Sequence, residues 1–183
     1  SDALQVTVAS ATIDDVTAGD LVISEIMFNP NVGSSADENE WIEIYNTTTH
    51  DIDIAGLIVQ DDDGDSGSIA ESVVVGAGDY AVLARGDADS WVYPFTPAAY
   101  YGYIPLSNGG DVVSITDSTG GLLDEAANYG GMGGAGISVA LPVYNLNVDL
   151  NDFLGNWCEP DALIDGTGDY GTPGSEAGCG EAD

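Results

Sequence analysis

Short runs of alternating apolar and polar residues recur along this chain, and turn residues separate them. No window repeats its apolar residues with the 3.6-residue period of an amphipathic helix. Alternation places successive side chains on opposite faces of a strand, so the pattern predicts an all-β protein built as an antiparallel sandwich. The expected strands are residues 4–13, 21–28, 41–46, 52–60, 69–75, 80–84, 111–116, 122–129 and 136–140.

The segment from Trp41 to Tyr45 shows this alternation clearly. Ile42 and Ile44 fall on one face, whereas Trp41, Glu43 and Tyr45 fall on the other. We expect the isoleucine face to build the core and the second face to be aromatic and partly solvated.

The composition limits the partners of the folded chain. One lysine or arginine, Arg85, stands against 32 acidic residues, and the formal net charge is -31 at pH 7. A surface this acidic repels nucleic acid and anionic lipid, so we expect no nucleic-acid partner and no membrane insertion. Arg85 is expected to form a local ion pair with a carboxylate. Hydrophobic residues make up 44% of the chain, which favours a folded domain over disorder.

Such a charge must be screened for the chain to fold. At an ionic strength of about 1 M the Debye length falls to about 3 Å, so a saline, halophilic setting would suffice. Bound Ca²⁺ is the alternative, and the two explanations are compatible.

Residues 61–68 form the densest acidic run, with alternating carboxylates and a glycine that permits a tight bend. This pattern suits a hard cation such as Ca²⁺, although no flanking helices complete a helix-loop-helix calcium motif. A solvated acidic turn is the alternative. The candidate ligands are Asp61, Asp63, Asp65 and Glu71. Two weaker candidate groups are Asp161, Asp165 and Asp169, and Asp37, Glu38 and Glu40.

Cys158 and Cys179 lie in a Gly- and Asp-rich tail with no second cysteine pair and no nearby histidine. We expect a disulfide that closes a C-terminal loop, rather than two free thiols or a partial metal site. A disulfide indicates an oxidising compartment. The chain also begins at Ser1, as a mature protein does after signal removal, so we expect a secreted, extracellular or cell-surface location.

Two segments carry a family resemblance: Leu-Val-Ile-Ser-Glu-Ile-Met-Phe-Asn-Pro at 21–30 and Glu-Trp-Ile-Glu-Ile-Tyr-Asn at 40–46. Together they resemble the paired opening signature of lamin-tail domains. Further matching segments follow in the family's order at 53–57, 76–83, 106–111, 157 and 171–174. The resemblance implies an immunoglobulin-like β-sandwich in residues 21–183 that serves as a structural or interaction module without an active site. The chain departs from the family at Leu57, where an aromatic residue is usual, and lacks the usual basic residue after Ser138.

Residues 1–20 fall outside the resemblance and contain one more alternating run. The run is either the first strand of its own sandwich or a donor strand that completes the sheet of a neighbouring copy, with residues 14–20 as a hinge. Its apolar positions are Leu4, Val6, Val8, Ala11 and Ile13.

A non-periodic segment between residues 87 and 103 carries several aromatic side chains. They either fill the core or an interface, or form a platform that stacks on surface glycans. The residues concerned are Trp91, Tyr93, Tyr100, Tyr101 and Tyr103.

Catalysis is not expected. Carboxylate pairs are too numerous to single out an acid and a base, and His50, the sole histidine, lies in a turn. The sequence therefore predicts a structural subunit of an extracellular filament or assembly, with copies of itself as partners. An adhesion or carbohydrate-binding module is the alternative.

Overall fold

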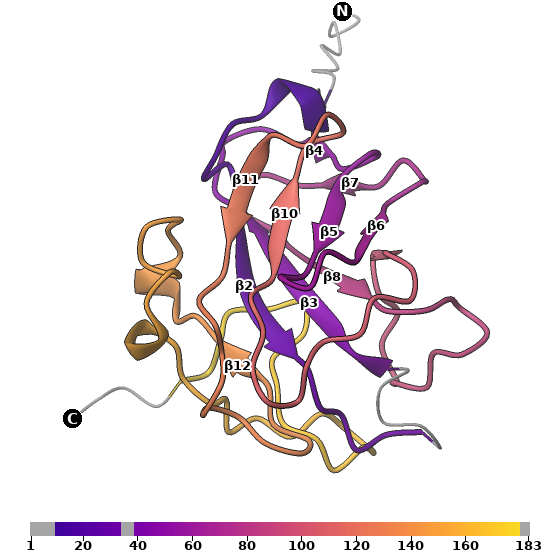
Figure 1. Cartoon of the computed structure of the whole chain (residues 1–183), viewed down its shortest axis with the longest axis vertical. Helices are drawn as coiled ribbons and strands as arrows, with labels where there is room; N and C mark the ends of the chain where they lie inside the picture. The colour runs from indigo at the N-terminus through magenta and orange to yellow at the C-terminus, as the bar shows by residue number, and fades with distance from the viewer. Residues whose placement is uncertain (1–9, 34–38, 180–183) are drawn as a thin grey trace, which may run out of the picture.

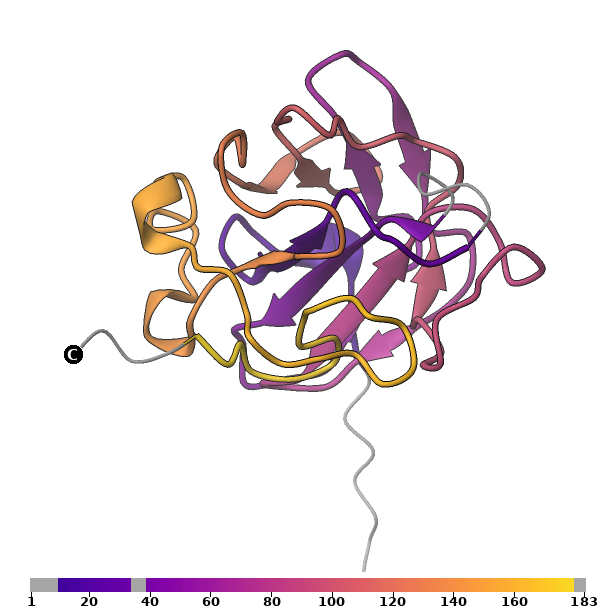
Figure 2. The same cartoon turned by 90° about the horizontal axis from the view of Figure 1, so that it is seen from below.

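The structure is a computed structural model that describes residues 10–33 and 39–179. Its strands face one another in layers around an apolar core, and the C-terminal segments run around the side and lower end of these layers (Figures 1 and 2). The secondary structure of the described residues is almost entirely strand and turn, with short 3₁₀ helices. The prediction of an all-β sandwich is confirmed.

The largest sheet has five strands in the order β12-β2-β3-β8-β9. At its centre β2 (Leu21–Met27) pairs antiparallel with β3 (Trp41–Asn46), and β8 (Tyr80–Ala84) pairs antiparallel with the other side of β3. The short strands β12 (Val139–Ala140) and β9 (Ala99–Tyr100) form its two edges.

Two smaller sheets complete the sandwich. The four-stranded sheet runs in the order β11 (Leu122–Glu125), β10 (Ser114–Thr116), β5 (Ile58–Gln60) and β6 (Ser66–Ser68). The three-stranded sheet runs in the order β1 (Ala11–Thr12), β4 (Ile52–Asp53) and β7 (Val74–Val75). In this smallest sheet β1 is parallel to β4, whereas β7 is antiparallel to β4.

The main core joins side chains from all three sheets. Ile44 of β3, Ile115 of β10 and Ile52 of β4 are fully buried members of the same apolar cluster. Burial of this kind supplies most of the free energy that holds a sandwich together. No helix among the described residues is long and apolar enough to cross a membrane.

The second face of β3 differs from expectation. Trp41 and Glu43 are buried rather than partly solvated, and Tyr45 is half-buried. Trp41 belongs to a second apolar cluster with Tyr93 and Ile164, which come from segments far away in the sequence. The alternation within β3 could not reveal that these distant segments cover its outer face.

The first expected strand, residues 4–13, is also partly wrong. Residues 4–9 lie outside the described part of the chain, and Ala11–Thr12 forms β1, but Ile13 begins the 3₁₀ helix Ile13–Asp15. The Asp15 carboxylate stops the strand by accepting hydrogen bonds from the Thr12 N–H at 3.1 Å and the Thr12 hydroxyl at 2.7 Å. Ile13 is nevertheless buried in the core.

The expected strand at 52–60 is divided into β4 and β5. A turn intervenes, in which the Leu57 N–H donates to the Ile54 carbonyl at 3.0 Å. Gly56 lies in this turn with a φ of +91°, a backbone conformation that residues other than glycine rarely adopt.

Candidate functional site

The acidic run lies at the tip of the β5–β6 hairpin. Asp61 and Asp65 close the turn, because the Asp65 N–H donates to the Asp61 carboxylate at 2.8 Å and the Asp61 N–H donates to the Asp65 carbonyl at 3.1 Å. Asp63 and Asp65 are exposed, and Glu71 lies in the exposed connection beyond β6. Within the described ranges, no three Asp, Glu, His or Cys side chains are arranged to hold a metal ion. Calcium binding therefore stays a prediction.

Another carboxylate contact at this hairpin, between Asp62 and Asp111, could not be predicted from the sequence. Burial, together with the nearby Asp62 carboxyl, raises the pKa of Asp111 to about 6. Two carboxyls that approach each other in this way favour retention of a proton at one of them.

One member of each weaker acidic group has a structural partner elsewhere in the fold. Asp169 is buried and accepts hydrogen bonds from the Tyr93 hydroxyl at 2.7 Å and from the Asn31 N–H. Glu40 forms an ion pair with Arg85 at 3.2 Å, which confirms the expected local pairing of that arginine. Asp161 and Asp165 are exposed, and Asp37 and Glu38 lie outside the described residues.

The aromatic residues form a packed cluster rather than an open platform. Tyr93 and Tyr101 are buried, and Trp91 and Tyr100 are half-buried. The Trp91 ring lies 5.1 Å from Tyr93 and 6.3 Å from Tyr100 between ring centroids. Tyr103 is 63% exposed and donates a hydrogen bond to the Asp87 carboxylate. Of the five candidate glycan contacts, the two buried tyrosines cannot present a ring face to a ligand.

An open groove of about 440 Å³ lies beside this cluster. Phe95 belongs to both the aromatic cluster and the groove. Its ring centroid lies 5.4 Å from that of Trp91, and Phe95 also lines the groove. The lining is mainly apolar, with polar atoms from Thr172, Ser175 and Asp165. Its main apolar residues are Pro94, Phe95, Leu163, Ile164 and Pro173. The walls come from irregular segments, so no periodic pattern could have predicted the groove.

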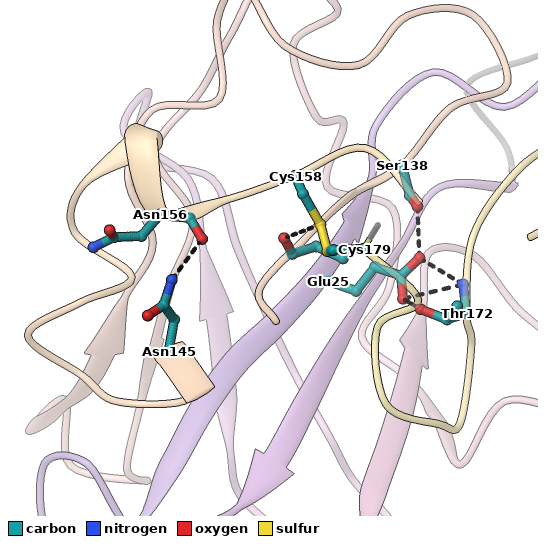
Figure 3. The surroundings of a disulfide bond; sticks show 8 residues. Glu25, Ser138, Asn145, Asn156, Cys158, Thr172 and Cys179 are labelled. Carbon is teal, nitrogen blue, oxygen red and sulfur yellow. Dashed lines mark hydrogen bonds between the residues drawn. A yellow bond between two sulfur atoms is a disulfide. The ribbon is translucent and has the colours of Figure 1, made fainter. Parts of the chain in front are cut away.

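Two buried carboxyls lie on the outer face of the large sheet. Glu25 accepts hydrogen bonds from the Ser138 hydroxyl at 2.5 Å and from the Thr172 N–H and hydroxyl at 2.9 and 2.6 Å (Figure 3). Glu43 accepts from the Ser24 hydroxyl at 2.9 Å and from the Gly174 N–H at 2.5 Å. These carboxyls therefore attach residues 172–174 to the sheet.

The surroundings of both carboxyls favour the protonated form. Burial raises the pKa of Glu25. Burial raises the pKa of Glu43 well above its ordinary value, and the neighbouring Glu25 carboxylate adds to the shift. Glu25 has two hydroxyl partners, Ser138 and Thr172, and Glu43 has one, Ser24. Because a hydroxyl can both donate and accept, these partners can also serve a protonated carboxyl.

The disulfide forms as expected. Cys158 and Cys179 are bonded, with 5.9 Å between their Cα atoms, and Cys158 also pairs with Ala140 at the edge of β12 (Figure 3). Nearby, the Asn145 side chain donates to the Asn156 carbonyl at 3.1 Å and joins two 3₁₀ helices, Val143–Asn145 and Leu154–Asn156. The C-terminal loop is thus cross-linked covalently and by hydrogen bonds.

The two segments that carry the resemblance are the paired central strands β2 and β3, and the segments that follow build the sheets around them. The family model of the Lamin Tail Domain matches residues 15–130. The chain belongs to the lamin tail domain family. The immunoglobulin-like fold implied by the resemblance is confirmed. No curated protein sequence matches the chain.

The family match ends before several features of this lamin tail domain. Residues 131–179 contain β12, both cysteines and most of the groove wall. The resemblance noted at Trp157 and at residues 171–174 lies beyond the matched range and remains a prediction. The groove therefore forms between the matched part of the domain and its C-terminal segment.

Proposed function

We propose that this lamin tail domain is a non-enzymatic, secreted structural subunit of an extracellular or cell-surface assembly. In this proposal copies of the chain are linked when the N-terminal segment of one copy adds to a sheet of another. Membership in an immunoglobulin-like structural family and the disulfide support the proposal. The acidic shell supports a requirement for Ca²⁺ or high salt, because copies of a chain with net charge -31 repel one another at low ionic strength.

One observation carries the proposal. β1 pairs with β4 in parallel through only two residues, Ala11 with Ile52 and Thr12 with Asp53. Parallel pairing of any earlier residue would need a strand before Ile52, and that position holds the turn at 47–51. Leu4, Val6 and Val8 precede Ala11 in the sequence. β4 does not extend far enough toward its N-terminal end to pair with them in parallel.

The test examines the full chain by negative-stain electron microscopy and light scattering at several salt concentrations, with and without Ca²⁺. We expect regular assemblies that form as the charge is screened. A full-length variant in which Leu4, Val6 and Val8 are replaced by serine keeps the net charge and is expected to stay monomeric. Monomers of the original chain under every condition, or assemblies of the serine variant that match the original, would refute the proposal.

The groove favours a second candidate function, an adhesion or carbohydrate-binding module. Sugar rings stack on aromatic faces while their hydroxyls bond to polar groups, and this groove combines Phe95 with Thr172 and Asp165. Binding to an array of glycans by a monomeric protein, lost on substitution Phe95→Ala, would favour this candidate. Failure of every glycan to bind would dismiss it.

A further inference from the structure

The exposed edge of β7 differs from the edges formed by β12 and β11, which other segments of the chain cover with backbone hydrogen bonds. At the edge of the large sheet, Ala140 of β12 exchanges backbone hydrogen bonds with Cys158 at 2.9 and 2.8 Å. At the edge of the four-stranded sheet, the Leu123 carbonyl of β11 accepts from the Gly19 N–H at 3.0 Å. At its other edge, Gly67 of β6 lies so close to the Tyr101 backbone that a Cβ there would overlap the Tyr101 carbonyl oxygen. The β12 and β11 edges are therefore bonded to other segments of the chain, and the Tyr101 segment packs closely against Gly67 of β6.

Val74 in β7 directs its backbone away from β4. Val75 lies opposite Ile52, and the Val73 carbonyl accepts a hydrogen bond from the Ile54 N–H at 2.9 Å. The backbone N–H and C=O groups of residues 73 and 75 therefore point toward β4. In an antiparallel pair the intervening residue points its N–H and C=O outward. Within the part of the chain that the structure describes, no hydrogen bond reaches the outward Val74 N–H. The Val74 side chain is 54% exposed.

We propose that the β7 edge, centred on Val74, accepts residues 4–9 of a second copy as an added strand. This inference rests on the proposed function and specifies which edge receives the donor. β1 and β7 lie at opposite edges of the same three-stranded sheet. The donor segment therefore precedes the strand at one edge, and the acceptor strand β7 forms the other edge. Addition would satisfy the Val74 backbone groups and cover its apolar side chain.

Charge also favours this occupant. Asp2 is the single charged side chain among residues 1–9, although the whole chain carries -31. Exposed carboxylates flank β7, including Glu71 and Asp79. A nearly neutral segment can approach this acidic edge at ionic strengths where most other parts of the chain would be repelled.

Proline at position 74 provides a selective test. Because the Val74 N–H points away from β4, Val74→Pro removes no hydrogen bond seen among residues 10–33 and 39–179 but deletes the donor that an incoming strand needs. Val74→Thr is the matched control, since threonine keeps the N–H and suits a strand. Circular dichroism and the melting temperature establish that both variants are folded.

The assay uses a fluorescent peptide of residues 1–12 and the full-length variant whose Leu4, Val6 and Val8 are serine. This variant keeps the acceptor edge but has an altered donor, so fluorescence anisotropy reports peptide binding alone. We expect binding to this protein and to its Val74→Thr derivative, and at least about tenfold weaker binding to its Val74→Pro derivative. Mixing full-length Val74→Pro protein with the serine variant should give a one-to-one complex, because each supplies what the other lacks.

Hydrogen exchange gives an independent readout without substitutions. The Val74 amide should become protected in assemblies of the original chain. If the original chain assembles while Val74→Pro protein assembles equally well, the acceptor is a different edge and the proposed function still stands. If neither assembly nor peptide binding occurs, both proposals fail. A monomer with a protected Val74 amide would place the segment on its own β7 and overturn the exchange between copies.

Discussion

Glu25 and Glu43 are cross-strand partners on β2 and β3, and both carboxyls are buried beneath residues 172–174. A β-bulge between Ile23 and Glu25 shifts the register at this point. Burial raises the pKa of Tyr80 and Tyr93, and the charges of Glu43 and Glu25 add to the shifts of Tyr80 and Tyr93 respectively. The attachment of the C-terminal segment is therefore linked to pH.

The glutamate pair should make the domain less stable as the pH rises. Below the ordinary carboxyl pKa of about 4.3, folded and unfolded chains are both protonated and the pair imposes no penalty. Above it, the unfolded chain ionises first, so the free energy of unfolding falls until the raised pKa values of the folded state are passed. Urea denaturation across this range would measure the slope.

Glu43→Gln should reduce that slope. The glutamine oxygen can accept from the Gly174 N–H while its amide donates to the Ser24 hydroxyl, so both contacts remain without a charge. Near pH 8, where the ionised pair destabilises the fold, we expect the free energy of unfolding of this variant to exceed that of the original protein. Glu125→Gln, at an exposed position of β11, serves as the charge-matched control and should not reproduce the gain. An unchanged pH profile in Glu43→Gln would contradict this account.

Asp124 should titrate near neutrality. Its carboxylate accepts from the Ile23 N–H at 2.6 Å and the Asn151 side chain at 2.7 Å, but burial outweighs these bonds and raises the pKa of Asp124 to about 7. The ¹³C chemical shift of this carboxyl should therefore change with a midpoint near pH 7. A midpoint near the ordinary aspartate value of about 3.9 would show that the hydrogen bonds dominate instead.

Asn46→Ala should be strongly destabilising. The buried Asn46 amide donates to the carbonyls of His50, Val75 and Gly76 at 2.9, 3.1 and 3.0 Å, and its oxygen accepts from Thr48. Loss of this side chain removes all of these hydrogen bonds at once, and we expect a cost of about 2–4 kcal/mol in urea denaturation. Thr48→Ala removes the hydroxyl contacts with Asn46 and His50, of which those with His50 are exposed, and should cost no more than about 1 kcal/mol. Equal effects from the two changes would disprove the special role of Asn46.

Breaking the disulfide should loosen the C-terminal segment. The bond joins residues 21 positions apart, and its removal by Cys158→Ser with Cys179→Ser should lower the free energy of unfolding by about 3 kcal/mol. Reduction of the original protein should give a similar loss, which controls for the substitutions. Cleavage by a glutamate-specific protease at Glu176 should also become faster, because the segment would no longer be tethered. Unchanged cleavage and stability would show that hydrogen bonds alone hold it.

The long strands were predictable from the sequence with nearly their observed bounds. The expected ranges 69–75, 111–116, 122–129 and 136–140 each contain a strand shorter than predicted, and two short strands were missed. β3 and β8 have the expected bounds, and β2 ends one residue early, because their apolar alternation spans five or more residues. β6 has the sequence Ser-Gly-Ser and β9 has two residues, so neither carries a periodic signal. Both strands depend on a neighbour that already exists in the fold.

Local sequence patterns also could not predict contacts between segments that are distant in the sequence. The burial of Trp41 depends on Tyr93 and Ile164, and the groove depends on segments near residues 94 and 172. The Cys158–Cys179 pair was predictable because the described chain and its sequence offer no other pairing. Glu25 and Glu43 gave a weaker signal, since each interrupts an otherwise apolar strand that lies in the centre of a sheet.

The opposite positions of β1 and β7 in one small sheet would also determine how an assembly grows. A row of copies joined through these edges has two chemically different ends, one with a bare N-terminal segment and one with a bare Val74 backbone. Subunits would therefore add at unequal rates to the two ends, and neither end could join its own kind. A small proportion of Val74→Pro protein would terminate growth at one end while leaving the other free to extend.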